Sequence, residues 1–185
     1  MRRRTLSQHL QRVVSCSRLA FCALLVVVLG GEGCSGRAAQ LRARLSPTYD
    51  LVEDGLYMGG QVSQPPPGTQ AVLNLSEDPD PYAAPVHRWE PIPDGPPAPN
   101  LEWLRTQVSF VDEQRRQGKT VYVHCKVGVS RSGMVVVAYE MWKNHWTFDQ
   151  ALAFVRSKRS IVRPNPAFRP LLEEWERVVL GAPGH

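Results

Sequence analysis

The chain has little cysteine with which to build a folded domain. Three of its four cysteines, Cys16, Cys22 and Cys34, lie within the first 34 of its 185 residues. Only Cys125 belongs to the remainder, so an intramolecular disulfide framework is excluded there. A single cysteine of this kind is either a small buried hydrophobic side chain or a reactive thiol, and only its neighbours can distinguish the two.

A long basic surface is also missing. The formal net charge is +5, but five arginines and one acidic residue fall within the first 34 residues. The rest of the chain carries 17 basic and 16 acidic side chains and is nearly neutral. It contains no basic stripe interleaved with aromatic residues, so no nucleic acid is expected as a partner. The length suits a single domain with one hydrophobic core.

No hydrophobic run is long enough for an ordinary membrane span. Residues 19–29 (LAFCALLVVVL) are 11 apolar residues, about 16 Å as a helix against roughly 30 Å of hydrocarbon. They follow several arginines and precede a glycine-rich stretch, which is the layout of an export signal rather than of a buried core helix. We therefore expect residues 1–34 to be a leader and the protein to be exported, either periplasmic or membrane-anchored.

Cys34 follows a glycine shortly after this run, and the segment resembles a lipoprotein signal, although the usual leucine three residues before the cysteine is missing. Arg3 and Arg4 loosely resemble a twin-arginine signal. A lipid on Cys34 would attach the protein to a membrane through its N-terminus, whereas cleavage would release it, and both outcomes stay open. Residues 35–48 are then a polar tether, and residues 49–185 form the folded domain.

The folded domain is predicted to begin with short strands. Residues 55–60 and 71–75 have the composition of strands, and residues 87–91 extend as another. Residues 65–99 hold 11 of the 16 prolines, which disfavours helices and favours structured loops. Trp89 is expected to reach the core from this loop-rich region.

Helices are predicted for the C-terminal half. Residues 101–117 carry apolar side chains at helical spacing, and Asn100 is placed to cap their N-terminus. Thr147 opens the capping box of a further helix, and Asn165, followed by a proline, begins the last one. Residues 120–124 have the composition of a buried central strand. Strands that precede helices, with a strand-loop-helix unit at the centre, predict an α/β domain.

A chemically distinctive motif, HCKVGVSRS, occupies residues 124–132 directly after the central strand. A phosphate group needs a ring of backbone N–H donors, and a loop between a strand and a helix N-terminus supplies such a ring. A glycine inside the loop permits the tight curl. The residues expected to bind phosphate are Lys126, Val127, Gly128, Val129, Ser130 and Arg131.

Cys125 is the predicted nucleophile. The same N–H donors, the helix dipole and Arg131 stabilise negative charge and would lower the pKa of its thiol. Arg131 can hold two phosphate oxygens in a bidentate fork, which a lysine cannot do. Ser132 is expected to hydrogen-bond the sulfur and help it leave, and His124 to fix the loop. The alternative, a surface loop with a chance cysteine and arginine, disagrees with the strand and helix signals on either side.

A leaving oxygen must be protonated as it departs, so an acid is needed from elsewhere in the chain. Asp94 lies 31 residues before Cys125, in the sequence PIPDGP of residues 91–96. Prolines and a glycine on either side would let this loop approach the substrate. A solvated turn aspartate is the alternative role. Competing acids are Glu90, Asp78 and Asp80, with Asp112 the weakest because it falls inside a predicted helix.

Residues 49–179 resemble the dual-specificity phosphatases, a family within the cysteine-dependent protein tyrosine phosphatase superfamily that carries the HCx5R signature. The resemblance rests on residues 56–59, residues 72–75, Asp94, the loop after Cys125, and Asn165 preceded by a proline.

The resemblance implies a central, mostly parallel sheet flanked by helices, with no metal and no cofactor. It also implies a phosphocysteine intermediate, proton donation by Asp94 and support of the phosphate loop by Asn165, which is otherwise only a helix cap. It makes residues 134–142 a helix, although their valine run alone favours a strand. Val127 and Gly133 depart from the alanines common in the family, so the packing of the loop differs in detail.

Three functions stay open. The first is hydrolysis of phosphotyrosine in proteins, with phosphoserine and phosphothreonine as further substrates, and it rests on the family analogy. The second is a phosphatase for lipid or inositol phosphates, favoured by membrane proximity and by Lys126, Arg156, Arg159 and Arg163. The third is a phosphate-binding module without catalysis, which the intact motif disfavours. The expected partner is a phosphorylated protein or another phosphomonoester, and the protein is expected to be a monomer.

Overall fold

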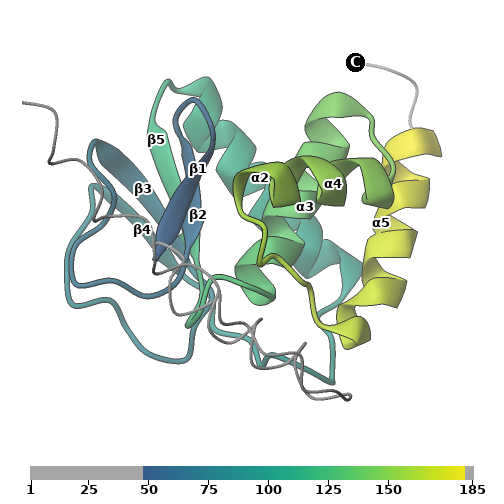
Figure 1. Ribbon diagram of the computed structural model, residues 1–185, viewed down its shortest axis with the longest axis horizontal. Coiled ribbons are helices and arrows are strands. Elements are labelled where there is room, and N and C mark those ends of the chain that lie inside the picture. The colour runs from purple at the N-terminus through teal and green to yellow at the C-terminus, as the bar shows by residue number, and fades with distance from the viewer. Residues whose placement is uncertain (1–47, 182–185) are drawn as a thin grey trace, which may run out of the picture.

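The computed structural model describes residues 48–181. The predicted leader with Cys34, residues 35–47 of the predicted tether, and residues 182–185 lie outside the described residues. Among those described, no helix is long and apolar enough to cross a membrane. They form a central sheet flanked by helices, which is the predicted α/β architecture (Figure 1).

The sheet has five strands in the order β1-β2-β5-β3-β4. Only β1 and β2 pair antiparallel, and the other three pairings are parallel, so the predicted mostly parallel sheet is confirmed. The strands are β1 (Tyr49–Glu53), β2 (Leu56–Gly59), β3 (Thr69–Asn74), β4 (Val86–Trp89) and β5 (Thr120–His124). The central position of β5 places the residues that follow it at the middle of one sheet edge.

The helices begin close to the predicted caps. Their bounds are α2 (Leu101–Arg116), α3 (Arg131–Asn144), α4 (Phe148–Lys158), the 3₁₀ turn η1 (Pro166–Phe168) and α5 (Arg169–Gly181). Asn100 accepts a hydrogen bond of 2.8 Å from the N–H of Trp103, and Thr147 closes the predicted capping box with Gln150. Asn165 caps η1 rather than a continuous helix, because the first turn after it is 3₁₀.

Helix α3 is the centre of the domain. It packs against β2 and β5 on one side and against α2, α4 and α5 on the others (Figure 1). Every residue from Arg131 to Met141 is buried, so this part of the helix is enclosed on all sides instead of along one stripe. That burial explains why residues 135–137, three valines, form a helix despite their strand preference: tertiary packing overrides the local propensity.

The two faces of the sheet have different neighbours. Val121 and Val123 on β5 join the hydrophobic core under the helices, whereas Tyr122 and His124 alternate to the opposite face. On that face the rings of Tyr122 and His124 stack with centroids 5.0 Å apart.

Trp89 does not reach the core, contrary to the prediction from sequence. Its side chain is 46% exposed, and its indole N–H donates a hydrogen bond of 2.9 Å to the carbonyl of Ser76. That bond holds the ring over the loop that follows β3, at the edge of the sheet where β5 ends.

Candidate active site

The phosphate loop, residues 125–131, curls between the end of β5 and the start of α3. Gly128 lies at its turn with φ of +74°, a conformation that L side chains rarely adopt. A Cβ atom there would lie 2.2 Å from the carbonyl carbon of Gly59. Glycine is therefore required at position 128 for two reasons: its backbone conformation, and its close contact with the end of β2.

Cys125 is buried at the base of this loop, with 1% of its surface exposed. Its Sγ lies 3.4 Å from the hydroxyl oxygen of Ser132, and the N–H of Gly128 donates to it over 3.4 Å. Burial opposes ionisation of the thiol, but hydrogen bonds from the Ser132 hydroxyl and from backbone N–H groups of the loop outweigh it. The pKa of Cys125 is therefore lowered, which favours a thiolate.

The guanidinium of Arg131 is held in place by one of its nitrogens. Nη1 donates to the carbonyl oxygens of Ile92 at 3.0 Å and Leu75 at 3.3 Å, and to Oε2 of Glu77 at 2.6 Å. The hydrogen bond from Arg131 in turn lowers the pKa of Glu77, and the charge of Arg131 adds to this effect. Nε of Arg131 is buried and has no hydrogen-bond partner among residues 48–181. The edge that carries Nε is thus left for a ligand, as a bidentate phosphate contact requires.

Arg159 supports the loop from behind. Its Nε donates to the carbonyl of Gly128 at 2.8 Å, its Nη2 to that of Val127 at 3.4 Å, and its Nη1 to Oδ2 of Asp50 at 2.6 Å. These bonds engage the carbonyl side of the loop, which directs the peptide N–H groups the other way. The sequence analysis did not find this role, because Arg159 and Asp50 lie 109 residues apart.

Asp94 lies in residues 91–99, named the acid loop here after the predicted role of Asp94, and this loop contacts the phosphate loop. The hydroxyl of Ser130 donates to Oδ1 of Asp94 at 2.5 Å, and Nδ2 of Asn165 donates to its carbonyl at 2.9 Å. The backbone N–H of Asn165 also donates to the Ser130 hydroxyl at 2.9 Å. These three residues therefore join the acid loop, the phosphate loop and the segment before α5. Ser130 caps no helix N–H with its side chain, since its hydroxyl is used here.

Two of the competing candidate acids, Asp80 and Asp112, interact with other side chains. The carboxylate of Asp80 is fully buried and accepts hydrogen bonds from His124 and His87. Burial opposes its ionisation, but those bonds outweigh burial and lower its pKa, so Asp80 is a poor proton donor. Asp112 pairs with Arg116 one turn further along α2, at 2.9 Å.

The phosphate loop carries two exposed side chains directly after Cys125, those of Lys126 and Val127. Val127 is 60% exposed, and the ammonium of Lys126 lies 3.2 Å from Oδ2 of Asp78. Arg159, which the lipid-phosphate alternative assigned to a cationic surface, is 3% exposed and engaged with the loop. The cationic surface beside Cys125 is therefore smaller than the sequence suggested.

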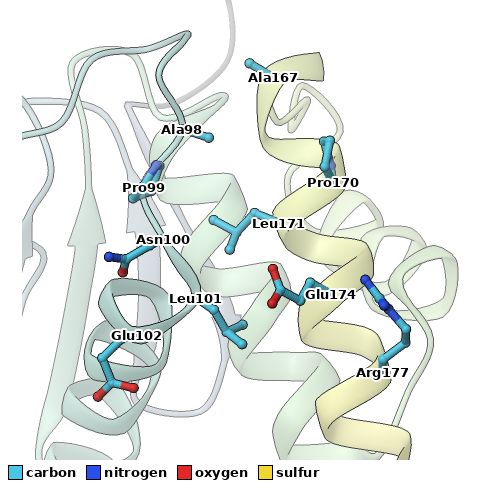
Figure 2. Close-up of a pocket in the computed structure, with 10 residues that line it drawn as sticks. All are labelled: Ala98, Pro99, Asn100, Leu101, Glu102, Ala167, Pro170, Leu171, Glu174 and Arg177. Carbon is cyan, nitrogen blue, oxygen red and sulfur yellow. The ribbon is translucent and has the colours of Figure 1, made fainter.

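A groove of about 610 Å³ flanks the acid loop and does not include Cys125. It lies between the start of α2 and α5, where Leu171 and Glu174 point from α5 toward α2 (Figure 2). Its lining contains none of the predicted catalytic residues. Within the part of the chain that the structure describes, no group of three or more His, Cys, Asp or Glu side chains is placed to hold a metal ion.

A buried, hydrogen-bonded cysteine in a phosphate loop, with a fixed arginine and a separate aspartate, defines a cysteine-dependent phosphatase. The family model for the dual specificity phosphatase catalytic domain matches residues 68–178, and the chain belongs to this family.

Similar proteins agree with that assignment. Protein phosphatase Slingshot homolog 2 from Homo sapiens is 31% identical over 117 residues, 62% of this chain and 8% of that protein. Dual specificity protein phosphatase 1 from Homo sapiens is 33% identical over 115 residues, 61% of this chain and 31% of that protein. The crystal structure of human DUSP28 superposes with a TM-score of 0.65 at 27% identity, covering 74% of this chain and 97% of that one. The chain thus spans less than a third of either curated relative.

Proposed function

We propose that this phosphatase hydrolyses phosphotyrosine in proteins, and phosphoserine and phosphothreonine as further substrates, through a phosphocysteine intermediate. The observation that carries the proposal is the pair of groups that the phosphate loop brings together. Cys125 lies at the base of the loop with a lowered thiol pKa, and Asp94 is hydrogen-bonded to Ser130 on the same loop. A nucleophile and an acid on one phosphate site are the two groups that ester cleavage needs.

In the first step the thiolate of Cys125 attacks phosphorus, the bond from phosphorus to the ester oxygen breaks, and Asp94 gives its proton to that oxygen. In the second step water attacks phosphorus, the phosphorus–sulfur bond breaks, and Asp94 takes a proton from the water. Backbone N–H groups of the loop and Arg131 stabilise the charge on the equatorial oxygens in both transition states. Ser132, 3.4 Å from Sγ, stabilises the thiolate as it leaves.

Protein substrates are favoured over lipid or inositol phosphates by the surroundings of the loop. Arg159 is buried and paired with Asp50, so one of the four cations that would recognise a polyanionic headgroup is unavailable, and the charge of Lys126 is partly offset by Asp78. The curated relatives reported above are both named as protein phosphatases. A rim that lacks one of these cations and holds an acidic residue beside another suits a single phosphate on a peptide better than a multiply phosphorylated headgroup.

A substrate panel tests this choice. We expect kcat/KM for a phosphotyrosine peptide to exceed that for soluble phosphoinositides by roughly tenfold or more, a difference of about 1.4 kcal/mol in transition-state binding. Asp78→Asn should free Lys126 to bind an anionic headgroup. It should therefore raise kcat/KM for phosphoinositides selectively and reduce the ratio of kcat/KM for the phosphotyrosine peptide to that for phosphoinositides. A panel in which phosphoinositides are the better substrates of the unmodified protein would replace the proposal with the lipid alternative. No turnover of any phosphomonoester would leave only a phosphate-binding role.

Arg131→Lys tests the role of the guanidinium fork. We expect a loss of roughly 10²–10³-fold in kcat, the usual cost of removing one transition-state donor. Lysine keeps the charge, but its single ammonium nitrogen cannot present two parallel N–H groups to phosphate as the planar guanidinium does. The measurement is steady-state hydrolysis, with Arg116→Lys on the exposed side of α2 as the matched control. A near-normal rate for Arg131→Lys would show that position 131 acts as a point charge only.

A further inference from the structure

Asp80 contacts two histidines, one of which immediately precedes the nucleophile. Its carboxylate is fully buried, and one oxygen, Oδ2, lies 3.0 Å from Nε2 of His124 and 2.9 Å from Nε2 of His87. A carboxylate only accepts hydrogen bonds, so both rings donate to it from Nε2. Burying a carboxylate is costly unless it is paired, and here two imidazoles, one from β4 and one from β5, provide that pairing.

His124 is the residue immediately before Cys125, and its ring is held on two sides. Asp80 holds the Nε2 edge, and Tyr122 stacks on the ring face with centroids 5.0 Å apart. The hydroxyl of Tyr122 in turn donates to the carbonyl of Gly60, beside the phosphate loop. Nδ1 of His124 is buried without a hydrogen-bond partner within residues 48–181. The bond to Asp80 is therefore the one that fixes the tautomer and orientation of this ring.

The acidic segment, residues 77–80, contributes three carboxylates to the residues around the phosphate loop. Glu77 pairs with Arg131, Asp78 with Lys126, and Asp80 with His124. The side chains of Glu77 and Asp78 are more than half exposed, and exposed ion pairs contribute little to holding a loop in place. Asp80 is buried and bonds His124, so of these three carboxylates it is the one best placed to hold the segment against the end of β5.

We propose that Asp80 is a positioning residue for the nucleophile: through His124 it holds the start of the phosphate loop in the conformation whose N–H groups stabilise the Cys125 thiolate. The proposal deepens the function proposed above and rests on it, because it gives Asp80 a purpose in the chemistry of Cys125. It also replaces the earlier alternative in which Asp80 donates the proton.

The direction in which the pKa of the Cys125 thiol changes when Asp80 loses its charge distinguishes a positioning role from a purely electrostatic one. The groups facing Asp80 are His87 from β4, His124 and Tyr122 from β5, and Tyr82 from its own loop. Through space, removing a negative charge near Cys125 would stabilise the thiolate or leave it unchanged. Loss of positioning would instead weaken the N–H hydrogen bonds to sulfur and raise the pKa of the thiol.

The test is the pH dependence of Cys125 alkylation by iodoacetamide in Asp80→Asn. Only the thiolate reacts, so the rate reports its fraction without any need for phosphatase turnover. We expect the thiol pKa to rise by about one unit, so that alkylation at pH values below it slows about tenfold. The rate at pH values above the raised pKa should match that of the unmodified protein. A thiol pKa that is unchanged or lower in the folded variant would overturn the proposal.

Two further sets of variants keep the result interpretable. Asp78→Asn removes a carboxylate from the same segment without touching His124, and its thiol pKa should stay unchanged or fall. His124→Phe cuts the same contact from the other side, so Asp80→Asn added to it should raise the thiol pKa no further. Additive shifts in that cycle would contradict action through His124.

A variant that fails to fold would be detected by its thermal transition, and His124→Gln then takes its place. Glutamine can present an N–H near the position of Nε2, so His124→Gln should keep more of the low thiol pKa than His124→Phe does. Equal shifts in the two variants would overturn the proposal. Because alkylation needs no substrate, a protein that hydrolyses no phosphoprotein still tests Asp80, and the two failures stay distinguishable.

Discussion

Cys125→Ser should abolish turnover, by at least about 10⁴-fold, while binding of phosphate esters persists. The loop lowers the pKa of the Cys125 thiol and so favours the thiolate. The ordinary pKa of a serine hydroxyl is too high for the same hydrogen bonds to ionise it. The phosphate site itself is built from backbone N–H groups and Arg131, and neither changes in this variant. Steady-state hydrolysis gives the loss, and calorimetric titration with a phosphopeptide gives the retained affinity.

A trapping experiment supports the same prediction independently. Rapid acid quench of the unmodified protein with labelled substrate should leave phosphate covalently attached, and Cys125→Ser should leave none. Cys34→Ser, the same chemical change outside the described residues, is the matched control and should hydrolyse and trap normally. Robust residual turnover in Cys125→Ser would remove the thiol from the mechanism. Loss of both turnover and phosphopeptide binding would indicate that the substitution disturbs the loop.

The pH dependence of kcat/KM follows from the direction in which the pKa of the Cys125 thiol is shifted. The pKa of Cys125 is lowered in the folded protein, so the rise of kcat/KM with pH should occur below the ordinary thiol range near 8.5. The same shift stabilises the folded state, and its contribution is fully present above the thiol pKa of the unfolded chain. Between that pKa and the lowered pKa the folded state binds fewer protons than the unfolded chain, so the contribution is lost as pH falls through this window.

The parts of the site that lie together in the chain could be predicted from sequence. Residues 120–124, the loop with Gly128 and the helix after it are contiguous, so composition and spacing define them locally. Asn100 and Thr147 cap the predicted helices for the same reason. Strand β1 was not predicted, because its YDLVE sequence is only partly buried at a sheet edge and carries little alternation.

The contacts that hold the site together could not be predicted in this way. Glu77 and Arg131 lie 54 residues apart, His124 and Asp80 lie 44 apart, and Arg159 and Asp50 lie 109 apart. The first two pairs form because β3 lies beside β5 in the sheet, and the third forms because the end of α4 packs against β1. The acidic segment 77–80 was visible in the sequence, but nothing local distinguishes a buried carboxylate with two histidine partners from a solvated one.

Asp94→Asn should slow hydrolysis of alkyl and tyrosyl phosphates by roughly 10²–10⁴-fold, the usual contribution of general acid catalysis. The substitution is well suited to isolate the proton, because the backbone carbonyl that accepts from Asn165 is kept and the new amide oxygen can still accept from Ser130. The acid loop should therefore remain against the phosphate loop. Any loss then reports the missing proton rather than a displaced loop.

The signature of that role is dependence on the leaving group. Para-nitrophenolate departs readily without a proton, so its phosphate ester should lose much less rate than an alkyl phosphate in Asp94→Asn. The profile of kcat/KM should also change from a bell to a single rise, since the fall at higher pH requires a carboxylic acid that ionises and asparagine has none. Equal slowing of good and poor leaving groups would make Asp94 structural, acting only through Ser130 and Asn165. Glu90, which follows β4 and precedes the acid loop, would then be the next acid to test, because the carboxylate of Asp80 is buried and held by two histidines.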